Sequence, residues 1–314
     1  MSDQDSHPES QAYSSQQPVF LHRGFAGLTG AYADPEFAAT VILPVPYDAT
    51  SEWQSGSRHG PQAIIDASQY LELYDLDLDL EPYRAGIATL PQMEPVLGNP
   101  KAMVDRVYQV VNGLIQKGKL VVMLGGEHSI SLGAVRAFRE RFTSLSVLQL
   151  DAHADLRNEY LGTGYGQACV MRRIHELCPI TQAGVRSLSS EEKQFMMQNR
   201  LTPFFMSSLT TDPACIPDLV NSLTDDVYVT IDVDVLDPSI MPAVGTPEPD
   251  GMNWRQLMDI LKSVARHKNI VGFDLVEFCP GQGLHSCAFL LAKLAYRLIG
   301  CALPPGSIEA DPGC

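Results

Sequence analysis

The chain has 314 residues, of which 45% are hydrophobic, so it has room for one large α/β domain or two small ones around a sizeable core. Its 37 Asp and Glu outnumber its 22 Lys and Arg, which gives a formal charge of −15. This excess of acid argues against nucleic acid or an anionic membrane as a main partner, because basic surfaces bind both.

Short apolar runs alternate with amphipathic segments along the chain. The apolar runs fall at 40–44, 120–124, 145–150, 226–233 and 270–276. The amphipathic segments fall at 101–116, 130–142, 190–199, 254–266 and 286–299. Strands that are apolar on both faces and separated by helices are typical of a parallel sheet covered on both sides. We therefore predict a three-layer α/β/α fold with a central, mainly parallel sheet, whose ligands bind beyond the carboxyl ends of the strands.

The two ends of the chain and the cysteines bear on where the protein resides. Residues 1–20 are rich in Ser and Gln without the apolar stretch of a secretory signal, and we expect this segment to be disordered and 303–314 to be a tail. No apolar run approaches the roughly 18 residues of a membrane helix. The seven cysteines are odd in number and lack CxxC spacing, which favours free thiols. We predict a cytoplasmic protein.

Acidic residues and histidines follow three of the predicted strands, in the motifs GGEHS, DAHAD and DVD. The side chains in question are His128, Asp151, His153, Asp155, Asp232 and Asp234. Side chains alternate along an extended chain, so residues two apart in one motif can share a side. Any one motif alone is more often a solvated turn or a helix cap. Together they place four carboxylates and two imidazoles at one edge of the sheet.

Charged groups at the ends of buried strands are costly unless they are paired or bind a metal. Oxygen ligands with two nitrogens suit a pair of divalent ions such as Mn²⁺, whereas a structural zinc site would prefer thiolates. Two ions close together can lower the pKa of a shared water and supply a nucleophile. The sequence therefore predicts a hydrolytic two-metal site.

These motifs resemble the ureohydrolases, the family of arginase, agmatinase and guanidinobutyrase. The resemblance rests on GGEHS (125–129), DAHADLR (151–157) and TIDVDVLDPSIMPAVGTPEP (230–249), and it extends to TSEWQSGSRHGPQAIIDAS (50–68) and FDLVEFCP (273–280). SRHGPQAI together with QAGVRSLSSEE is more similar to agmatinase than to arginase. The resemblance implies one arginase-like domain, which we place at 21–302.

The resemblance also implies a role for each site residue. Two Mn²⁺, or Ni²⁺ or another divalent ion, would be held by His128, Asp151, Asp155 and Asp232 and by His153, Asp151, Asp232 and Asp234. Glu277 matches the carboxylate that pairs with the substrate guanidinium, and Thr246 lies in a segment that lines the same pocket. Asp155 would relay a proton from the attacking water to the leaving amine. A carboxylate is needed because the resonance-stabilised guanidinium must be held in one orientation for attack.

Gln167 departs from the family pattern, because relatives usually carry there a histidine that acts as proton shuttle or substrate contact. Glutamine can hydrogen-bond but cannot exchange protons near neutral pH. Water could replace the shuttle with some loss of rate, the guanidino substrate could differ, or the protein could bind metal and perform little chemistry. His175 is a candidate replacement, although its place in a predicted helix favours a surface role. Asp250, where relatives commonly have glycine, would favour a substrate with a second cationic end if it faces the pocket.

These observations together predict hydrolysis of a guanidino compound to urea and an amine, with agmatine, which yields putrescine, as the leading substrate. Guanidinobutyrate, arginine and guanidine are the alternatives within the same class. A weakly active metal-binding paralogue is the alternative outside it. The trimers and hexamers of the family imply a homo-oligomer whose other partner is a small cationic guanidino substrate.

Overall fold

The computed structural model describes residues 23–304 apart from 213 and 283. Seven strands form one sheet in the order β2-β1-β3-β7-β6-β4-β5, and every neighbouring pair is parallel. The strands are β1 (Thr40–Val45), β2 (Ile87–Thr89), β3 (Leu120–Gly125), β4 (Leu145–Leu150), β5 (Ile180–Ala183), β6 (Asp226–Asp232) and β7 (Asn269–Val276). Five of them coincide with the predicted apolar runs. The two that were missed are β2, which has three residues, and β5, whose sequence ITQA is half polar.

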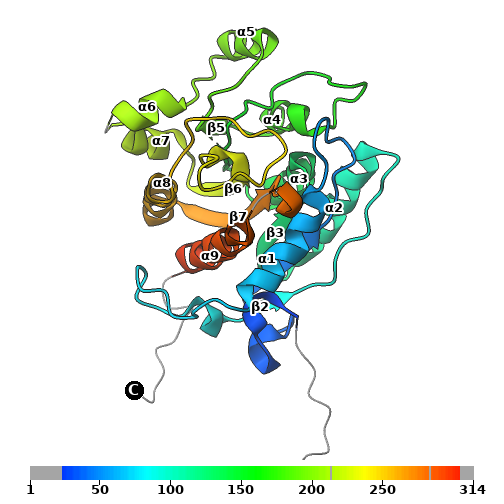
Figure 1. Cartoon of the computed structure of the whole chain (residues 1–314), viewed down its shortest axis with the longest axis vertical. Coiled ribbons are helices and arrows are strands. Elements are labelled where there is room, and N and C mark those ends of the chain that lie inside the picture. Colours follow the sequence, from blue (N-terminus) through cyan, green and yellow to red (C-terminus); the bar gives the residue numbers. More distant parts are fainter. Residues whose placement is uncertain (1–22, 213, 283, 305–314) are drawn as a thin grey trace, which may run out of the picture.

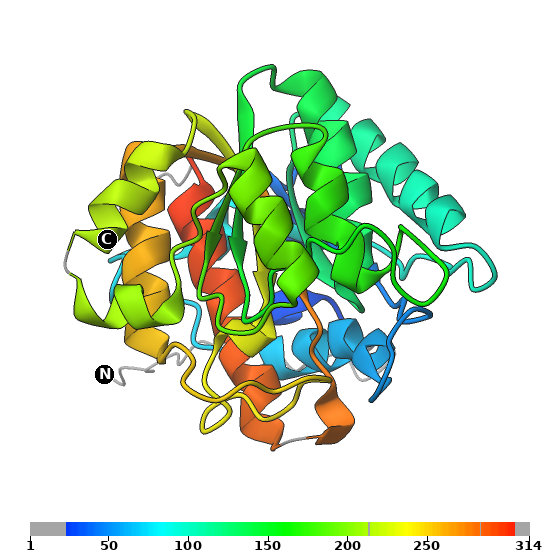
Figure 2. The same ribbon diagram turned by 90° about the horizontal axis from the view of Figure 1, so that it is seen from above.

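Helices cover both faces of this sheet (Figures 1 and 2). In the described part of the chain they are α1 (Gly60–Ser68), α2 (Pro100–Gln116), α3 (Ser131–Arg141), α4 (Val170–His175), α5 (Ser190–Asn199), α6 (Met206–Thr211), α7 (Cys215–Ser222), α8 (Trp254–His267) and α9 (His285–Ala302). The five predicted amphipathic segments are α2, α3, α5, α8 and α9. The short helices α1, α6 and α7 were missed, and α7 has Pro217 in its first turn, where proline is tolerated.

Two apolar layers bury the faces of the sheet. Side chains of α1, α7, α8 and α9 form one layer with residues such as Ile231 and Phe273. Side chains of α2, α3 and α4 form the other with residues such as Val121 and Tyr228. The predicted single-domain, three-layer α/β/α fold is therefore confirmed.

The turn after β3 lies unusually close to the segment after β1. A Cβ atom on Gly126 would lie 1.9 Å from the carbonyl oxygen of Tyr47, so only glycine fits there. The approach lets Gly126 N donate to Val45 O at 2.9 Å and Glu127 N donate to Tyr47 O at 2.7 Å. These bonds join two loops at the carboxyl end of the sheet, where the predicted site residues lie.

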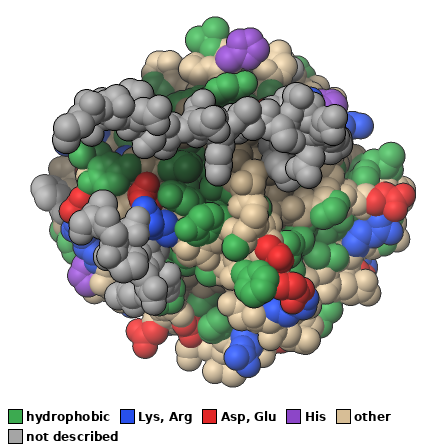
Figure 3. Space-filling view, turned by 90° about the horizontal axis from the view of Figure 1, so that it is seen from below, with side chains coloured by type: hydrophobic (Ala, Val, Ile, Leu, Met, Phe, Trp, Pro, Cys, Tyr) green, Lys and Arg blue, Asp and Glu red, His purple; other side chains and the backbone are tan. Residues whose placement is uncertain are grey.

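The predicted end segments fall mostly outside the described residues, since 1–22 and 305–314 are not described. The six cysteines within the described ranges are free thiols, as expected. No helix among residues 23–304, with the two gaps noted, is long and apolar enough to cross a membrane. On the face seen from below, acidic and basic side chains are interspersed among hydrophobic ones (Figure 3).

Candidate active site

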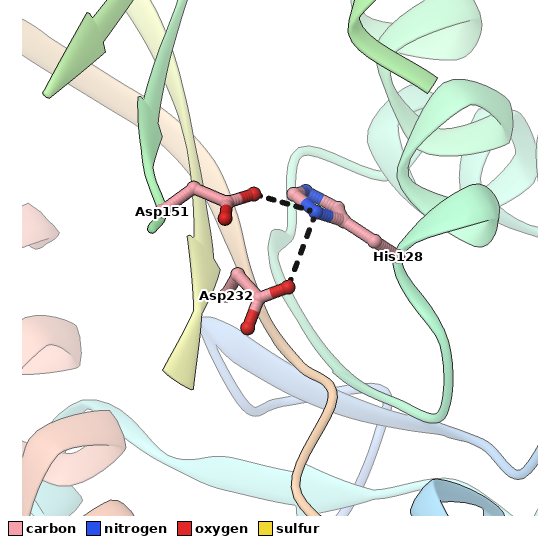
Figure 4. Close-up of side chains that lie close together, drawn as sticks. All are labelled: His128, Asp151 and Asp232. Atoms are coloured by element: carbon pink, nitrogen blue, oxygen red, sulfur yellow. Dashed lines mark ion pairs between the residues drawn. The ribbon is translucent and has the colours of Figure 1, made fainter. Parts of the chain in front are cut away.

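The carboxyl ends of three strands bring the predicted site residues together. His128 follows β3, Asp151 follows β4, and Asp232 is the last residue of β6. Figure 4 shows the imidazole of His128 pointing toward the two carboxylates from the opposite side. β4 and β6 are neighbours in register, with Leu150 beside Ile231, and this pairing sets their terminal carboxylates next to each other.

The first group of candidate metal ligands surrounds Nδ1 of His128. This atom lies 3.1 Å from Oδ2 of Asp151, 3.1 Å from Oδ2 of Asp155 and 3.6 Å from Oδ2 of Asp232. All four residues are buried. His128, Asp151 and Asp232 each offer a ligand atom within 4.8 Å of the others, which is close enough to share one ion.

The second group shares Asp151 with the first and adds His153 and Asp234. Nδ1 of His153 lies 2.9 Å from Oδ2 of Asp234 and 3.7 Å from Oδ1 of Asp151. These three residues also offer ligand atoms within 4.8 Å of one another. The structure therefore brings all six predicted ligands into two adjoining groups, with Asp151 common to both.

The hydrogen bonds of His128 test whether this cluster fits a cation. Thr230 donates its hydroxyl proton to Oδ1 of Asp274 at 2.6 Å, so the same hydroxyl must accept from Nε2 of His128 at 2.9 Å. In the neutral imidazole, that bond places the ring proton on Nε2 and leaves a lone pair on Nδ1, which has no hydrogen-bond partner among the described residues. A lone pair facing three carboxylates is unfavourable without a cation between them. The donor set fits divalent metal ions.

The pKa values of the cluster reflect the same crowding of negative charge. Burial would lower the pKa of His128, but Asp151, Asp155 and Asp232 together raise it well above its usual range. Burial, followed by the charge of Asp151, raises the pKa of Asp155 to about 7. The pKa of Asp232 is also raised, first by burial and then by Asp234 and Asp151. Such shifts are expected where carboxylates converge on a site for cations.

Glu277 and Asp155 both adopt backbone conformations that are rare for residues other than glycine. Their φ angles are 66° and 53°, in the left-handed region. Oε1 of Glu277 accepts from the backbone N–H of His128 at 2.7 Å, which fixes the carboxylate beside the first group. Burial raises the pKa of Glu277 well above its usual value, and the charge of Glu127 adds to the effect. Strain of this kind persists where the surroundings hold a functional residue in place.

A cavity of about 220 Å³ opens onto these groups. Its wall contains His153, Asp155, Asp232 and Glu277, and the sequence-predicted residues Gln167 and Thr246 also line it. Gln167 begins a short 3-10 helix, and its backbone N–H donates to Oγ1 of Thr50 at 3.2 Å. The residues expected from the motifs therefore either line this cavity or belong to the two ligand groups next to it.

The two further candidates, His175 and Asp250, are not part of the cavity wall. The His175 ring packs edge-on against Phe195, with centroids 5.8 Å apart, so it does not replace the missing histidine. Asp250 is exposed, and its φ of 63° explains why both Asp and Gly suit this turn. Asp250 therefore adds no charge to the pocket wall.

Several residues that support the site were not singled out from the sequence. Arg186 donates from Nη2 to the carbonyl oxygens of Asp234 at 2.7 Å and Glu248 at 2.8 Å, and from Nε to that of Pro249 at 2.9 Å. It thereby ties a candidate ligand to the loop that carries Thr246. Arg186 lies three residues after β5, a strand that the sequence pattern did not predict, so no local pattern pointed to this role.

Glu127, within GGEHS, was also missed. Its buried carboxylate accepts from the backbone N–H of Thr50 at 2.6 Å and from the hydroxyls of Thr50 and Ser129 at 2.5 Å each. Burial raises the pKa of Glu127 to about 7, against these hydrogen bonds, which lower it. Because Thr50 in turn holds Gln167, Glu127 links the turn after β3 to the cavity wall.

Comparison with known proteins agrees with this geometry. The chain belongs to the arginase family, whose model matches residues 38–301. It is 38% identical over 279 residues to the N(1)-aminopropylagmatine ureohydrolase of Synechocystis sp., covering 86% of this chain and 90% of that protein. It is 35% identical over 274 residues to the agmatinase of Pyrococcus horikoshii, covering 85% of this chain and 93% of the relative.

Among solved structures, the agmatine ureohydrolase of Thermoplasma volcanium matches with a TM-score of 0.83 at 32% identity, covering 90% of this chain and 95% of that one. The chain is a ureohydrolase enzyme of the agmatinase type. The expected similarity to the ureohydrolases is thus confirmed.

Proposed function

We propose that this ureohydrolase hydrolyses agmatine to putrescine and urea. The observation that carries the proposal is the convergence of two His/Asp groups and Glu277 on one cavity. A second candidate substrate is N(1)-aminopropylagmatine, because relatives at 35–38% identity bear that substrate in their names. Both compounds carry a guanidinium and at least one further amine.

We propose that two Mn²⁺ occupy the site, with Ni²⁺ as an alternative. His128, Asp151, Asp155 and Asp232 would hold one ion, and His153, Asp151, Asp232 and Asp234 the other. When bound, such a pair of ions lowers the pKa of a water molecule and supplies a nucleophile at neutral pH. Oxygen-rich ligand sets of this kind suit manganese, although affinity alone would favour other first-row ions.

The residues of the chain have separate tasks in this proposal. Oε1 of Glu277 is occupied by the N–H of His128, so Oε2 accepts from the substrate guanidinium and orients its plane. Asp155 lines the cavity beside Glu277 and relays a proton from the attacking water to the leaving amine. Gln167 and Thr246 contact the substrate from the wall through hydrogen bonds. Glu277 thereby converts binding of a planar cation into the orientation that attack requires.

We also propose that the protein is cytoplasmic and forms a homo-oligomer, a trimer or a hexamer. Free thiols support a reducing compartment. Size-exclusion chromatography with light scattering would measure the mass in solution, and a monomer would contradict this part of the proposal.

The function is tested by urea release from agmatine, N(1)-aminopropylagmatine, arginine, guanidinobutyrate and guanidine, with the protein loaded with Mn²⁺ or Ni²⁺. We expect turnover of the amine-tailed compounds, and we expect Asp234→Ala to abolish it. Asp250→Asn is the control, because it removes an exposed acid that does not line the cavity. Absence of urea from every compound, with two metal ions bound per chain, would exclude the proposed reaction.

A further inference from the structure

The carboxylates in the cavity wall can be sorted by the contacts that they already make. Those that line the cavity are Glu52, Asp155, Glu192, Asp232 and Glu277. Asp155 and Asp232 face His128 in the first ligand group, and Glu277 is fixed by the backbone N–H of His128. These three stand at the base of the cavity.

Glu192 is also committed, because its carboxylate completes the N-terminal cap of α5. It accepts from the N–H and the hydroxyl of Ser189 at 2.7 Å each. Its other oxygen accepts from the backbone N–H of Leu156 at 2.9 Å. With these bonds in place, Glu192 has little capacity left for a ligand. Glu52 is the remaining carboxylate of the set.

Glu52 lines the cavity nearer to solvent than the buried metal-ligand carboxylates do. It belongs to the loop between β1 and α1 and is exposed, whereas Asp155 and Asp232 are buried. A substrate whose guanidinium reaches Glu277 at the base extends its tail toward the opening. The side chain that meets this tail is therefore an anionic one.

Gln167 orients the Glu52 carboxylate. Its side chain lies within hydrogen-bonding reach of the Glu52 carboxylate, and both residues line the cavity. The amide donor holds the carboxylate in place, and the lone pairs that it leaves free suit a group with several N–H bonds; an ammonium ion has three.

Arg157 is the side chain in this wall that would favour a tail of the opposite charge. It lines the cavity too, and its positive charge acts on Glu52. Its guanidinium carbon, however, lies 4.7 Å from the ring centroid of Tyr160, a residue that lines the neighbouring cavity rather than this one. The stacking holds Arg157 against Tyr160, and no ion pair within 4.0 Å joins it to Glu52 in the described part of the chain, so the Glu52 carboxylate is free to meet a ligand.

We propose that Glu52 determines substrate specificity by binding the ammonium group at the far end of the guanidino substrate, with the amide of Gln167 holding its carboxylate in place. The inference rests on the proposed function and adds the means by which cationic tails are selected over neutral and anionic ones. Glu52 does not touch the reacting atoms, so it acts on KM rather than on kcat.

The test compares agmatine with 1-butylguanidine, which has the same chain length but no ammonium group, using the Mn²⁺-loaded protein. In Glu52→Gln we expect the ratio of kcat/KM for agmatine to that for 1-butylguanidine to fall about fivefold, through KM, as befits an ion pair near solvent. If 1-butylguanidine is not turned over, its inhibition constant replaces KM in the ratio. Glu52→Asp, which keeps the charge, should recover part of the loss.

Glu159→Gln is the matched control, because it removes the same charge from an exposed position on a neighbouring loop outside the cavity wall. An unchanged ratio in Glu52→Gln, or an equal fall in Glu159→Gln, would overturn the inference. The inference would also be overturned if the wild type preferred 4-guanidinobutyrate and Arg157→Gln lost this preference, because Arg157 would then select the tail. If the wild type releases urea from none of these compounds, the proposed function fails and this inference fails with it; turnover with an unchanged ratio overturns the inference alone.

Discussion

Thr230 accepts a hydrogen bond from Nε2 of His128 at 2.9 Å while it gives its own proton to Asp274 at 2.6 Å. Asp274 also accepts from the hydroxyl of Tyr228 at 2.7 Å, so the chain of bonds ends on a fixed carboxylate. All of these side chains are buried. The orientation of a candidate metal ligand is thus set from inside the sheet, by side chains of β6 and β7.

Thr230→Val tests this relationship, because it keeps the shape of the side chain and removes its hydroxyl. We expect the affinity for Mn²⁺ to fall about 10- to 100-fold, as is typical when the partner of a metal-bound imidazole is lost. Calorimetric titration of the metal-free protein measures it. Thr230→Ser retains the hydroxyl and should bind the metal nearly as the wild type does. Equal affinity in the valine and serine variants would show that the bond does not orient His128.

The sequence predicts the ligands better than it predicts their supports, for a physical reason. Asp151 and Asp232 could be placed together because all parallel strands end at one edge of the sheet, whichever strands are neighbours. Thr230 and Asp274 lie within apolar runs, where a lone polar residue gives no sign of its partner. Their contact depends on β6 pairing with β7 in the register that sets Thr230 beside Asp274. Strand order and register come from packing across the whole sheet, not from local pattern.

The same limit applies to Arg186, whose acceptors are backbone carbonyls. These carbonyls belong to the turn after β6 and to the loop before α8, about 50 to 60 residues away along the chain. Carbonyl groups are present at every residue, so no side-chain pattern reveals this contact. In contrast, Glu277 could be recognised because it directly follows an apolar strand and stands in FDLVEFCP, a motif that resembles the ureohydrolases.

Arg186→Lys should separate the shape of the guanidinium from its charge. Lysine keeps the charge but cannot donate in a fork to the carbonyls of Asp234, Glu248 and Pro249. We expect kcat/KM for agmatine to fall about 100-fold, because small displacements of positioning loops are costly to the rate. Steady-state kinetics measures this fall, and thermal unfolding shows whether the variant is still as stable as the wild type. Arg255→Lys, on the exposed side of α8, is the control. Retention of full activity would show that the positive charge alone suffices.

Gln167→His introduces an imidazole into the cavity wall, beside Asp155 and Glu52. We expect kcat for agmatine to rise at least about tenfold, since an imidazole can pass a proton to the leaving amine near neutral pH. The pH–rate profile should gain an inflection close to the usual imidazole pKa of about 6.5. A fall in kcat would instead show that the glutamine amide is itself needed for substrate binding.

A buried ion pair far from the site should govern stability in acid. Asp75 is 0% exposed, and its Oδ2 lies 2.9 Å from Nε of Arg297 and 3.4 Å from Nζ of Lys293. Burial alone would raise the pKa of Asp75, but the hydrogen bond and charge of Arg297, with the charge of Lys293, lower it below its usual value. The pair joins the segment after α1 to α9.

Because the pKa of Asp75 is lower in the folded protein than in the unfolded chain, its contribution to stability is complete above the unfolded value of about 3.9 and is lost as the pH falls further. Asp75→Asn should lower the free energy of unfolding by about 2–3 kcal/mol at pH 7, since the neutral amide removes the buried charge that pairs with Arg297 and Lys293. Urea unfolding at pH 7 and at pH 3 measures the difference, which should shrink at the lower pH. Asp259→Asn, on the exposed side of α8, should change little at either pH. A difference between wild type and Asp75→Asn that is the same at both pH values would mean that the charge of Asp75 does not stabilise the fold.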